Sequence, residues 1–168
     1  MAFLGGVLPI GYPTKTTELV TTNPVTVSEG PLLPENFYGH CSVLVKDNLF
    51  LIGGDGTQNK LLMIDVRTSV MTYKSELIHG RYWHACAKIT GSNGKKQIVV
   101  SGGYVNNVKS KSTEIYDIET DVWQEGNDFS NVLLIHAGFE LPAIYLLTSK
   151  VNLIFQDLIY LMHVKLAQ

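Results

Sequence analysis

The sequence has little net charge and almost no cysteine. Thirteen lysines and arginines stand against fifteen aspartates and glutamates in 168 residues, a formal net charge of −2. No global field of either sign draws the chain to a polyanion, so nucleic acid is not an expected partner. The two cysteines, Cys41 and Cys86, are too few for a disulfide-built scaffold of this length. We therefore expect a reducing compartment, the cytoplasm.

Long uncharged apolar runs are missing as well. The C-terminal third is the most apolar part of the chain, but Glu140, Lys150 and Asp157 divide it into pieces shorter than the ~18 residues of a membrane span. The apolar N-terminus has no basic residue ahead of it and no small-residue cleavage site, which argues against a signal peptide. We expect neither a membrane helix nor a membrane partner.

Glycine, in contrast, is abundant and recurs at a fixed interval. Glycine pairs end at residues 6, 54 and 103, which gives intervals of 48 and 49 residues. A β-rich apolar run precedes the second and third pairs, and a shorter one precedes the first. Downstream, Glu18-Leu-Val and Glu114-Ile-Tyr lie two intervals apart. These repeats predict that each pair ends a strand and that a further strand follows it.

Histidine supplies an independent register for the same repeat. His40, His84 and His136 each begin an apolar stretch, and the residues 13 positions before them are Val27, Met71 and Trp123. One unit then contains four strands: one after the histidine, one ending in the glycine pair, and two more up to the Trp123 position. Four strands in about 48 residues are typical of a β-propeller blade.

Residues 99–103, Val-Val-Ser-Gly-Gly, followed by Tyr116 and Trp123, resemble a kelch repeat. Residues 84–123 carry the full pattern of a glycine pair, a tyrosine and a tryptophan. Residues 40–73 keep Gly53, Gly54 and Asp65 but have methionine or isoleucine at the aromatic positions. The resemblance implies an all-β fold of kelch-type propeller blades, each a four-stranded antiparallel sheet. About three and a half blades would form an incomplete or open propeller.

The repeat divides the chain into four parts. Residues 1–36 are interpreted as the later strands of a first blade, 37–80 as a second blade and 81–130 as the best-matching blade. Residues 131–168 are either a degenerate partial blade or a segment foreign to the repeat. A helix is the alternative there, because five apolar residues would share one helical face: Phe155, Leu158, Ile159, Met162 and Leu166.

Two features that could suggest a ligand have simpler explanations. The glycine pairs lack the additional spaced glycines and the following helix of a phosphate-binding loop. Three histidines at equivalent positions would lie at equal radius on successive blades, where they cannot easily share one ion. We therefore expect no cofactor and no metal. Cys41 lies one residue after its histidine and Cys86 two, so we expect their thiols on opposite sides and no disulfide.

The loop that enters each blade provides the candidate binding residues. Residues 37–40, Phe-Tyr-Gly-His, align with residues 81–84, Arg-Tyr-Trp-His. In kelch proteins an arginine commonly precedes this strand, and loops at this rim often contact the partner. The candidates for partner contact are therefore Tyr38, Arg81, Tyr82 and Trp83, which are of the types enriched at binding hot spots. Packing at the blade junction is the equally weighted alternative. Trp123 is expected to pack between neighbouring blades.

The resemblance favours a protein-protein interaction module over an enzyme. It implies the substrate-recognition part of a ubiquitin-ligase adaptor or an actin-associated scaffold. The alternative is a fragmentary propeller without independent activity, because propellers contain about four to eight blades. A metal-dependent enzyme is the least favoured class, since no catalytic set of residues emerges. Exposed edges of the terminal blades predict self-association.

Overall fold

The fold is known from a computed structural model that describes residues 2–4, 14–91 and 94–130. In these ranges the secondary structure is all β, and no helix there is long and apolar enough to cross a membrane. The predicted strand and the alternative helix in residues 131–168, together with His136, lie outside the described residues. The strands are β1 (Ala2–Leu4), β2 (Thr17–Thr22), β3 (Val25–Glu29), β4 (Cys41–Val45), β5 (Asn48–Ile52), β6 (Leu61–Asp65), β7 (Met71–Tyr73), β8 (Arg81–Tyr82), β9 (Ala85–Thr90), β10 (Lys96–Ser101), β11 (Tyr104–Val105), β12 (Val108–Lys109), β13 (Thr113–Asp117) and β14 (Val122–Glu125).

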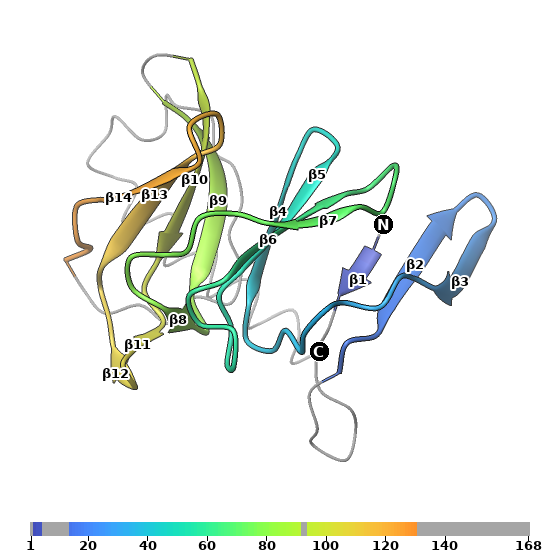
Figure 1. The fold of residues 1–168 in the computed structure, drawn as a ribbon, viewed down its shortest axis with the longest axis horizontal. Helices are drawn as coiled ribbons and strands as arrows, with labels where there is room; N and C mark the ends of the chain where they lie inside the picture. The colour runs from blue at the N-terminus through green and yellow to red at the C-terminus, as the bar shows by residue number, and fades with distance from the viewer. Residues whose placement is uncertain (1, 5–13, 92–93, 131–168) are drawn as a thin grey trace, which may run out of the picture.

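Two sheets of four antiparallel strands form the body of the molecule (Figure 1). We number the sheets in chain order. The second sheet has the strand order β4-β5-β6-β7, and the third has the order β9-β10-β13-β14. In both sheets the strand that directly precedes a glycine pair, β5 or β10, occupies the second position. This arrangement is an all-β fold with kelch-type four-stranded blades, as the sequence predicts, and the described sheets form no closed ring.

The hairpin between the last two strands of each sheet is closed in the same way. The Asp65 carboxylate accepts hydrogen bonds from the backbone N–H groups of Arg67 and Thr68. The Asp117 carboxylate does the same for Glu119 and Thr120. An aspartate that bonds to the backbone two and three residues ahead stabilises a tight turn. The aspartate common to both repeats therefore sets the end of the third strand.

The first sheet has three strands, in the order β1-β2-β3. Thr17 Oγ1 donates to the Pro31 carbonyl at 2.7 Å, and Thr113 Oγ1 donates to the Asn127 carbonyl at 2.8 Å. Behind each threonine a glycine N–H bonds to the threonine carbonyl, from Gly30 and from Gly126. The β2-β3 hairpin thus repeats the β13-β14 hairpin, so the first sheet holds the second, third and fourth strands of a blade.

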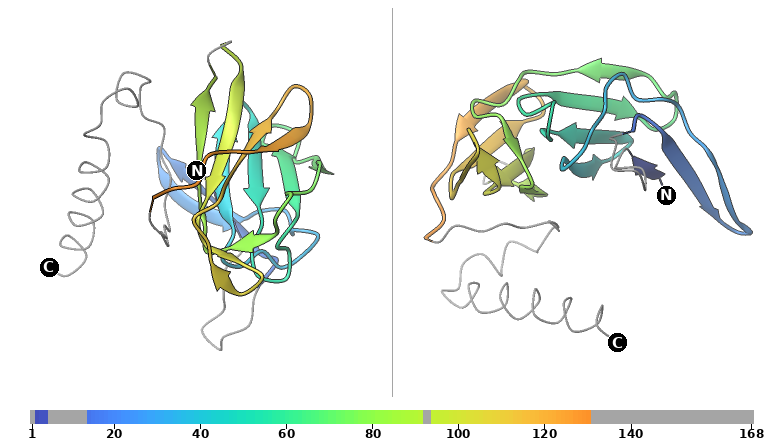
Figure 2. Two further views of the ribbon diagram at one scale, coloured as in Figure 1. Left: turned by 90° about the vertical axis from the view of Figure 1, so that its left-hand side faces the viewer. Right: turned by 90° about the horizontal axis from the view of Figure 1, so that it is seen from below.

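The three sheets follow one another along an arc, as Figure 2 shows. The main apolar cluster lies between the second and third sheets and contains Phe50, Ile52, Ile98, Tyr116 and Trp123 among its buried members. A second cluster covers the other face of the second sheet. The Trp123 indole N–H donates to the Ser75 carbonyl at 2.9 Å, so this side chain joins its blade to the segment that leads from the second sheet to the third.

The two cysteines form a disulfide with a Cα–Cα separation of 6.0 Å, so the expectation of unpaired thiols is wrong. Cys41 lies in the innermost strand of the second sheet, and Cys86 lies in the innermost strand of the third. Their side chains do point to opposite faces of equivalent strands. In stacked blades, however, the forward face of one sheet meets the rear face of the next, so opposite faces bring the two sulfurs together.

The disulfide predicts a redox-dependent stability. It closes a loop with a sequence separation of 45 residues and restricts the unfolded chain, which should add about 2 to 4 kcal/mol to the free energy of unfolding. We expect urea denaturation midpoints to fall when a reductant is added. The variant with both Cys41→Ala and Cys86→Ala serves as the control, because its midpoint should not respond to reductant. Equal midpoints of the oxidised and reduced wild-type chain would contradict the assignment.

Candidate functional site

A small sheet at one end of the third blade positions a group of aromatic side chains. It consists of β12, β11 and β8, which lie together near the lower left of Figure 1. Tyr104 of β11 pairs with Tyr82 of β8 in the antiparallel register. Directly opposed residues on neighbouring strands bring their side chains close. The two rings accordingly stack, with centroids 5.2 Å apart and planes 9° apart.

Trp83 lies at the centre of this group. Its ring centroid is 5.5 Å from that of Tyr82, 5.7 Å from that of Tyr104 and 6.4 Å from that of Tyr38, all in edge-to-face contacts. Such contacts stabilise aromatic groups beyond simple burial. Trp83 nevertheless remains 36% exposed. We call Tyr38, Tyr82, Trp83 and Tyr104 the rim aromatic cluster.

The backbone around Trp83 is held in an unusual conformation. Its φ of 52° falls in the left-handed region, which is uncommon for a large side chain. Its N–H donates to the Gly39 carbonyl at 2.8 Å. A Cβ on Gly39 would lie 2.4 Å from Trp83 Cδ1, so only glycine allows the indole to lie against this loop. The loops before the second and third sheets therefore meet at Trp83.

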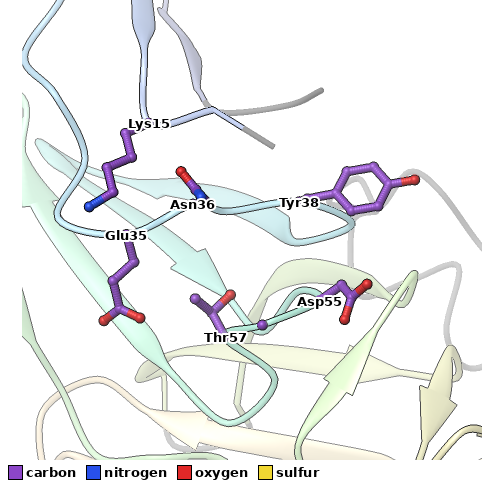
Figure 3. A pocket seen from close by; sticks show the side chains of 7 residues that line it. Lys15, Glu35, Asn36, Tyr38, Asp55 and Thr57 are labelled. Atoms are coloured by element: carbon purple, nitrogen blue, oxygen red, sulfur yellow. The ribbon is translucent and has the colours of Figure 1, made fainter. Parts of the chain in front are cut away.

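Beside Tyr38 the surface opens into a pocket of about 480 Å³ (Figure 3). The Asp55 N–H donates to the Tyr38 carbonyl at 2.6 Å, and this contact joins the 35–38 segment to the turn that follows Gly54. In Figure 3 the Tyr38 ring points away from Glu35. The lining residues are Lys15, Glu35, Asn36, Tyr38, Asp55, Gly56 and Thr57.

The two acidic residues of this pocket, Glu35 and Asp55, differ in the contacts that they make. The Glu35 carboxylate accepts hydrogen bonds from Lys60 Nζ and from the Tyr73 hydroxyl. The Lys60 bond, and then the Tyr73 bond, lower the pKa of Glu35. Burial, together with Glu35, raises the pKa of Tyr73 to about 12. Glu35 thus serves to fasten the loop to the second sheet, while Asp55 lies on the outer surface beside the rim aromatic cluster.

Arg81 does not lie on the surface, which corrects its assignment as a partner-contacting residue. The whole residue is 0% exposed. Its Nη2 contacts Glu114 Oε1 at 2.6 Å, and its Nη1 donates to the carbonyls of Gly102 and Ser112. A charged side chain is tolerated inside a protein when it is paired and hydrogen-bonded. An exposed loop residue was expected from its sequence position, but the guanidinium turns inward to this partner.

Glu114 also holds the loop that carries Arg81. Its carboxylate accepts hydrogen bonds from the backbone N–H groups of Ile78 and His79 at 2.8 and 3.1 Å. The carboxylate is therefore surrounded by a guanidinium and two backbone donors, which offset much of the cost of burying its charge. Arg81 and Glu114 together fix the segment that continues directly into Tyr82 and Trp83.

The second blade fills the equivalent positions with apolar side chains. Phe37 aligns with Arg81, and Leu62 has the same place in its sheet as Glu114, because Leu62 pairs with Leu51 as Glu114 pairs with Val100. Phe37 and Leu62 are both buried in one apolar cluster. The blade thus accepts either an ion pair or an apolar pair at this junction.

His84, next to the rim aromatic cluster in sequence, is buried and neutral. Burial first, and then the positive charge of Arg81, lowers the pKa of His84 to about 3. Neither ring nitrogen has a hydrogen-bond partner among the described residues. Burial also lowers the pKa of His40. Among the described residues, no three metal-ligating side chains gather into a group that could hold an ion.

The structure brings together three of the four predicted contact residues: Tyr38, Tyr82 and Trp83. Sequence reasoning missed Tyr104 and Glu114. A signal for Tyr104 existed, since it directly follows Gly103 and the glycine pair ends at the same rim. Gly103 approaches the loop so closely that a Cβ would lie 2.5 Å from the Tyr82 carbonyl oxygen. The glycine pairs therefore allow the loop that enters the blade to lie directly against the end of the strand.

Comparison with known families supports the same repeat. The family model described as the Kelch motif matches residues 92–130, which include β10 to β14. Kelch motifs generally form protein-interaction modules, and this fold is typically not enzymatic. No curated protein matches the chain closely enough to be a relative.

The buried ion pair predicts a large effect of a single truncation. Arg81→Ala leaves the Glu114 charge buried without its guanidinium, which should lower the free energy of unfolding by about 3 to 5 kcal/mol. The double variant Arg81→Phe with Glu114→Leu copies the second blade and should recover most of this loss. Urea denaturation measures both. A loss below about 0.5 kcal/mol for Arg81→Ala, as for an ordinary surface residue, would contradict the burial.

The buried histidine predicts a stability that falls in mild acid. The unfolded chain protonates His84 near pH 6.5, whereas the folded chain does so only near pH 3. Between these values the unfolded state binds more protons, so stability declines by about 1 kcal/mol per pH unit as pH falls. Denaturation from pH 6.5 to 4.5 measures the slope. His84→Leu should give a shallower slope, with His40 and the carboxylates of lowered pKa, such as Glu35, contributing the remainder. An unchanged slope would count against the buried state.

Proposed function

We propose that this chain, whose residues 92–130 match the Kelch motif, is a kelch-type protein-interaction module that binds its partner through the rim aromatic cluster. The observation that carries the proposal is Trp83, which is 36% exposed and contacts three tyrosine rings from three different segments of the chain. Tryptophan and tyrosine are the residues most enriched among those that dominate binding energy.

The rigidity of the cluster supports a binding role. Tyr82 and Tyr104 belong to a sheet, and Trp83 is held by Gly39 and by its aromatic neighbours. Groups that are already ordered lose little conformational freedom when a partner binds, so more of the contact energy appears as affinity. The adjoining pocket offers Asp55 and Asn36 as polar groups around the aromatic centre. An apolar centre with polar surroundings is typical of protein interfaces.

Within this class, the finer function is either the substrate-recognition part of a ubiquitin-ligase adaptor or an actin-associated scaffold. Both require only that the chain bind another protein, and neither requires catalysis. We therefore propose a binding protein without enzymatic activity or cofactor. The cytoplasm is the proposed location. Disulfides are usually kept reduced there, so the second and third blades would then be joined by their apolar contacts rather than by Cys41 and Cys86.

Truncation of the central ring provides the test of the proposed site. Trp83→Ala should weaken partner binding at least tenfold, because a central aromatic residue typically contributes about 2 kcal/mol or more. Proteins retained from a cell extract by the immobilised wild-type chain are identified first, and purified actin is tested by co-sedimentation. Titration of each retained protein against both forms of the chain then gives the ratio of dissociation constants.

A matched control separates loss of the site from general damage. Val70→Ala truncates a residue that is 58% exposed in the β6-β7 turn, at the opposite end of the second sheet, and it should leave binding unchanged. Gly39→Ala should displace the Trp83 ring and weaken binding without removing an aromatic group. Thermal melts confirm that the variants remain folded. Equal affinity of the Trp83→Ala and wild-type chains for every retained protein would contradict the proposal.

A further inference from the structure

The second and third blades differ at the residue that follows the glycine pair. In the third blade this residue is Tyr104, which pairs with Tyr82 and stacks on its ring. In the second blade it is Asp55, which forms an isolated antiparallel bridge with Tyr38. Directly opposed residues on neighbouring strands have their side chains on the same side. The second blade therefore places a carboxylate beside a tyrosine ring where the third blade stacks two rings.

The Asp55 side chain is exposed, and its charge is not neutralised within the chain. Among the residues that the structure describes, no side chain or backbone group bonds to its carboxylate. Its backbone is nevertheless held, because its N–H donates to the Tyr38 carbonyl at 2.6 Å. In the same pocket the Glu35 carboxylate accepts hydrogen bonds from Lys60 and Tyr73. Asp55 thus presents a negative charge from a fixed backbone position.

The cations around the pocket are engaged elsewhere. Lys15 donates from Nζ to the Pro34 carbonyl at 2.7 Å. In Figure 3 it lies with Glu35 toward the left of the pocket, whereas the Asp55 carboxylate and the Tyr38 ring extend to the right. The buried Arg81 is paired with Glu114. The side of the pocket next to the rim aromatic cluster is therefore negative and attracts a positive group.

An arginine side chain fits this combination of a carboxylate and aromatic rings. A guanidinium is planar, stacks on the face of an aromatic ring and can bond to a carboxylate through two N–H groups at once. The Tyr38 ring meets Trp83 edge to face, with planes 89° apart, so the two rings form a corner beside Asp55. The pocket of about 480 Å³ exceeds the lower limit of about 300 Å³ for ligand sites, so it has room for one long side chain.

We propose that the rim aromatic cluster recognises an arginine in a segment of the partner protein, with the guanidinium held by the Asp55 carboxylate and the Tyr38 ring. The neighbouring part of that segment would contact Trp83. This inference rests on the proposed function, because it names the partner chemistry that the same site selects. The aromatic rings supply contact area, and the charge of Asp55 supplies the selectivity, since charges at an interface exclude partners of the wrong sign.

Selection from a library of short random peptides displayed on phage tests the inference. The wild-type chain and Trp83→Ala are immobilised and screened in parallel. Peptides that bind the wild-type chain but not Trp83→Ala should contain arginine more often than the unselected library. Peptides that depend on Trp83 without this enrichment would overturn the recognition of arginine and leave the rim site standing. Peptides that bind both forms equally would contradict the rim site itself.

Charge removal then tests the role of Asp55 on one selected arginine peptide. Asp55→Asn keeps the shape of the side chain and should raise the dissociation constant about tenfold, because the guanidinium loses its partner. Asp47→Asn is the matched control, since it removes the same charge at the other end of β5, where Asp47 contacts Arg67. It should leave the dissociation constant unchanged. Equal dissociation constants for the two variants would overturn the inference.

A charge exchange separates direct contact from a change in the shape of the rim. Asp55→Lys should bind the arginine peptide more weakly than Asp55→Asn does. A peptide with glutamate in place of its arginine should bind Asp55→Lys more tightly than it binds the wild-type chain. Thermal melts show that each variant is folded. If Asp55→Lys gave the glutamate peptide no gain in affinity, the contact between Asp55 and the arginine would be refuted.

Discussion

The Arg81–Glu114 ion pair is the interaction on which the candidate site depends. Arg81 bonds to the end of β10 and to the segment before β13, while Glu114 bonds to the backbone of Ile78 and His79. The loop between the second and third sheets is thereby fixed at both sides. Because Tyr82 and Trp83 follow Arg81 directly, their exposure at the rim results from the burial of their neighbour. The buried Arg81–Glu114 pair thus orients the rim aromatic cluster from beneath, although Arg81 itself is not exposed at the rim.

The repeat allowed the sheets to be predicted, whereas the burial of Arg81 could not be predicted from the sequence of its own blade alone. Glycine pairs recur at intervals of 48 and 49 residues, and the histidines and the aspartates Asp65 and Asp117 recur at equivalent positions of the repeat, so the strand order could be predicted from the sequence. Arginine is usually exposed, and its partner Glu114 lies 33 residues away, so a buried pair is not evident locally. A comparison of the two blades would have revealed it. In the second blade Phe37 and Leu62 occupy the positions of Arg81 and Glu114, and apolar residues at these positions indicate that the junction is buried.

The cysteines show the same difference between one blade and a stack of blades. Alternation along a strand correctly assigned Cys41 and Cys86 to opposite faces. The inference that they cannot meet treated both as belonging to one sheet. In a stack, the forward face of each sheet contacts the rear face of the next, so residues on opposite faces of successive blades are neighbours. The apolar cluster obeys this rule too, because Phe50 and Ile52 face forward while Ile98 and Val100 face back.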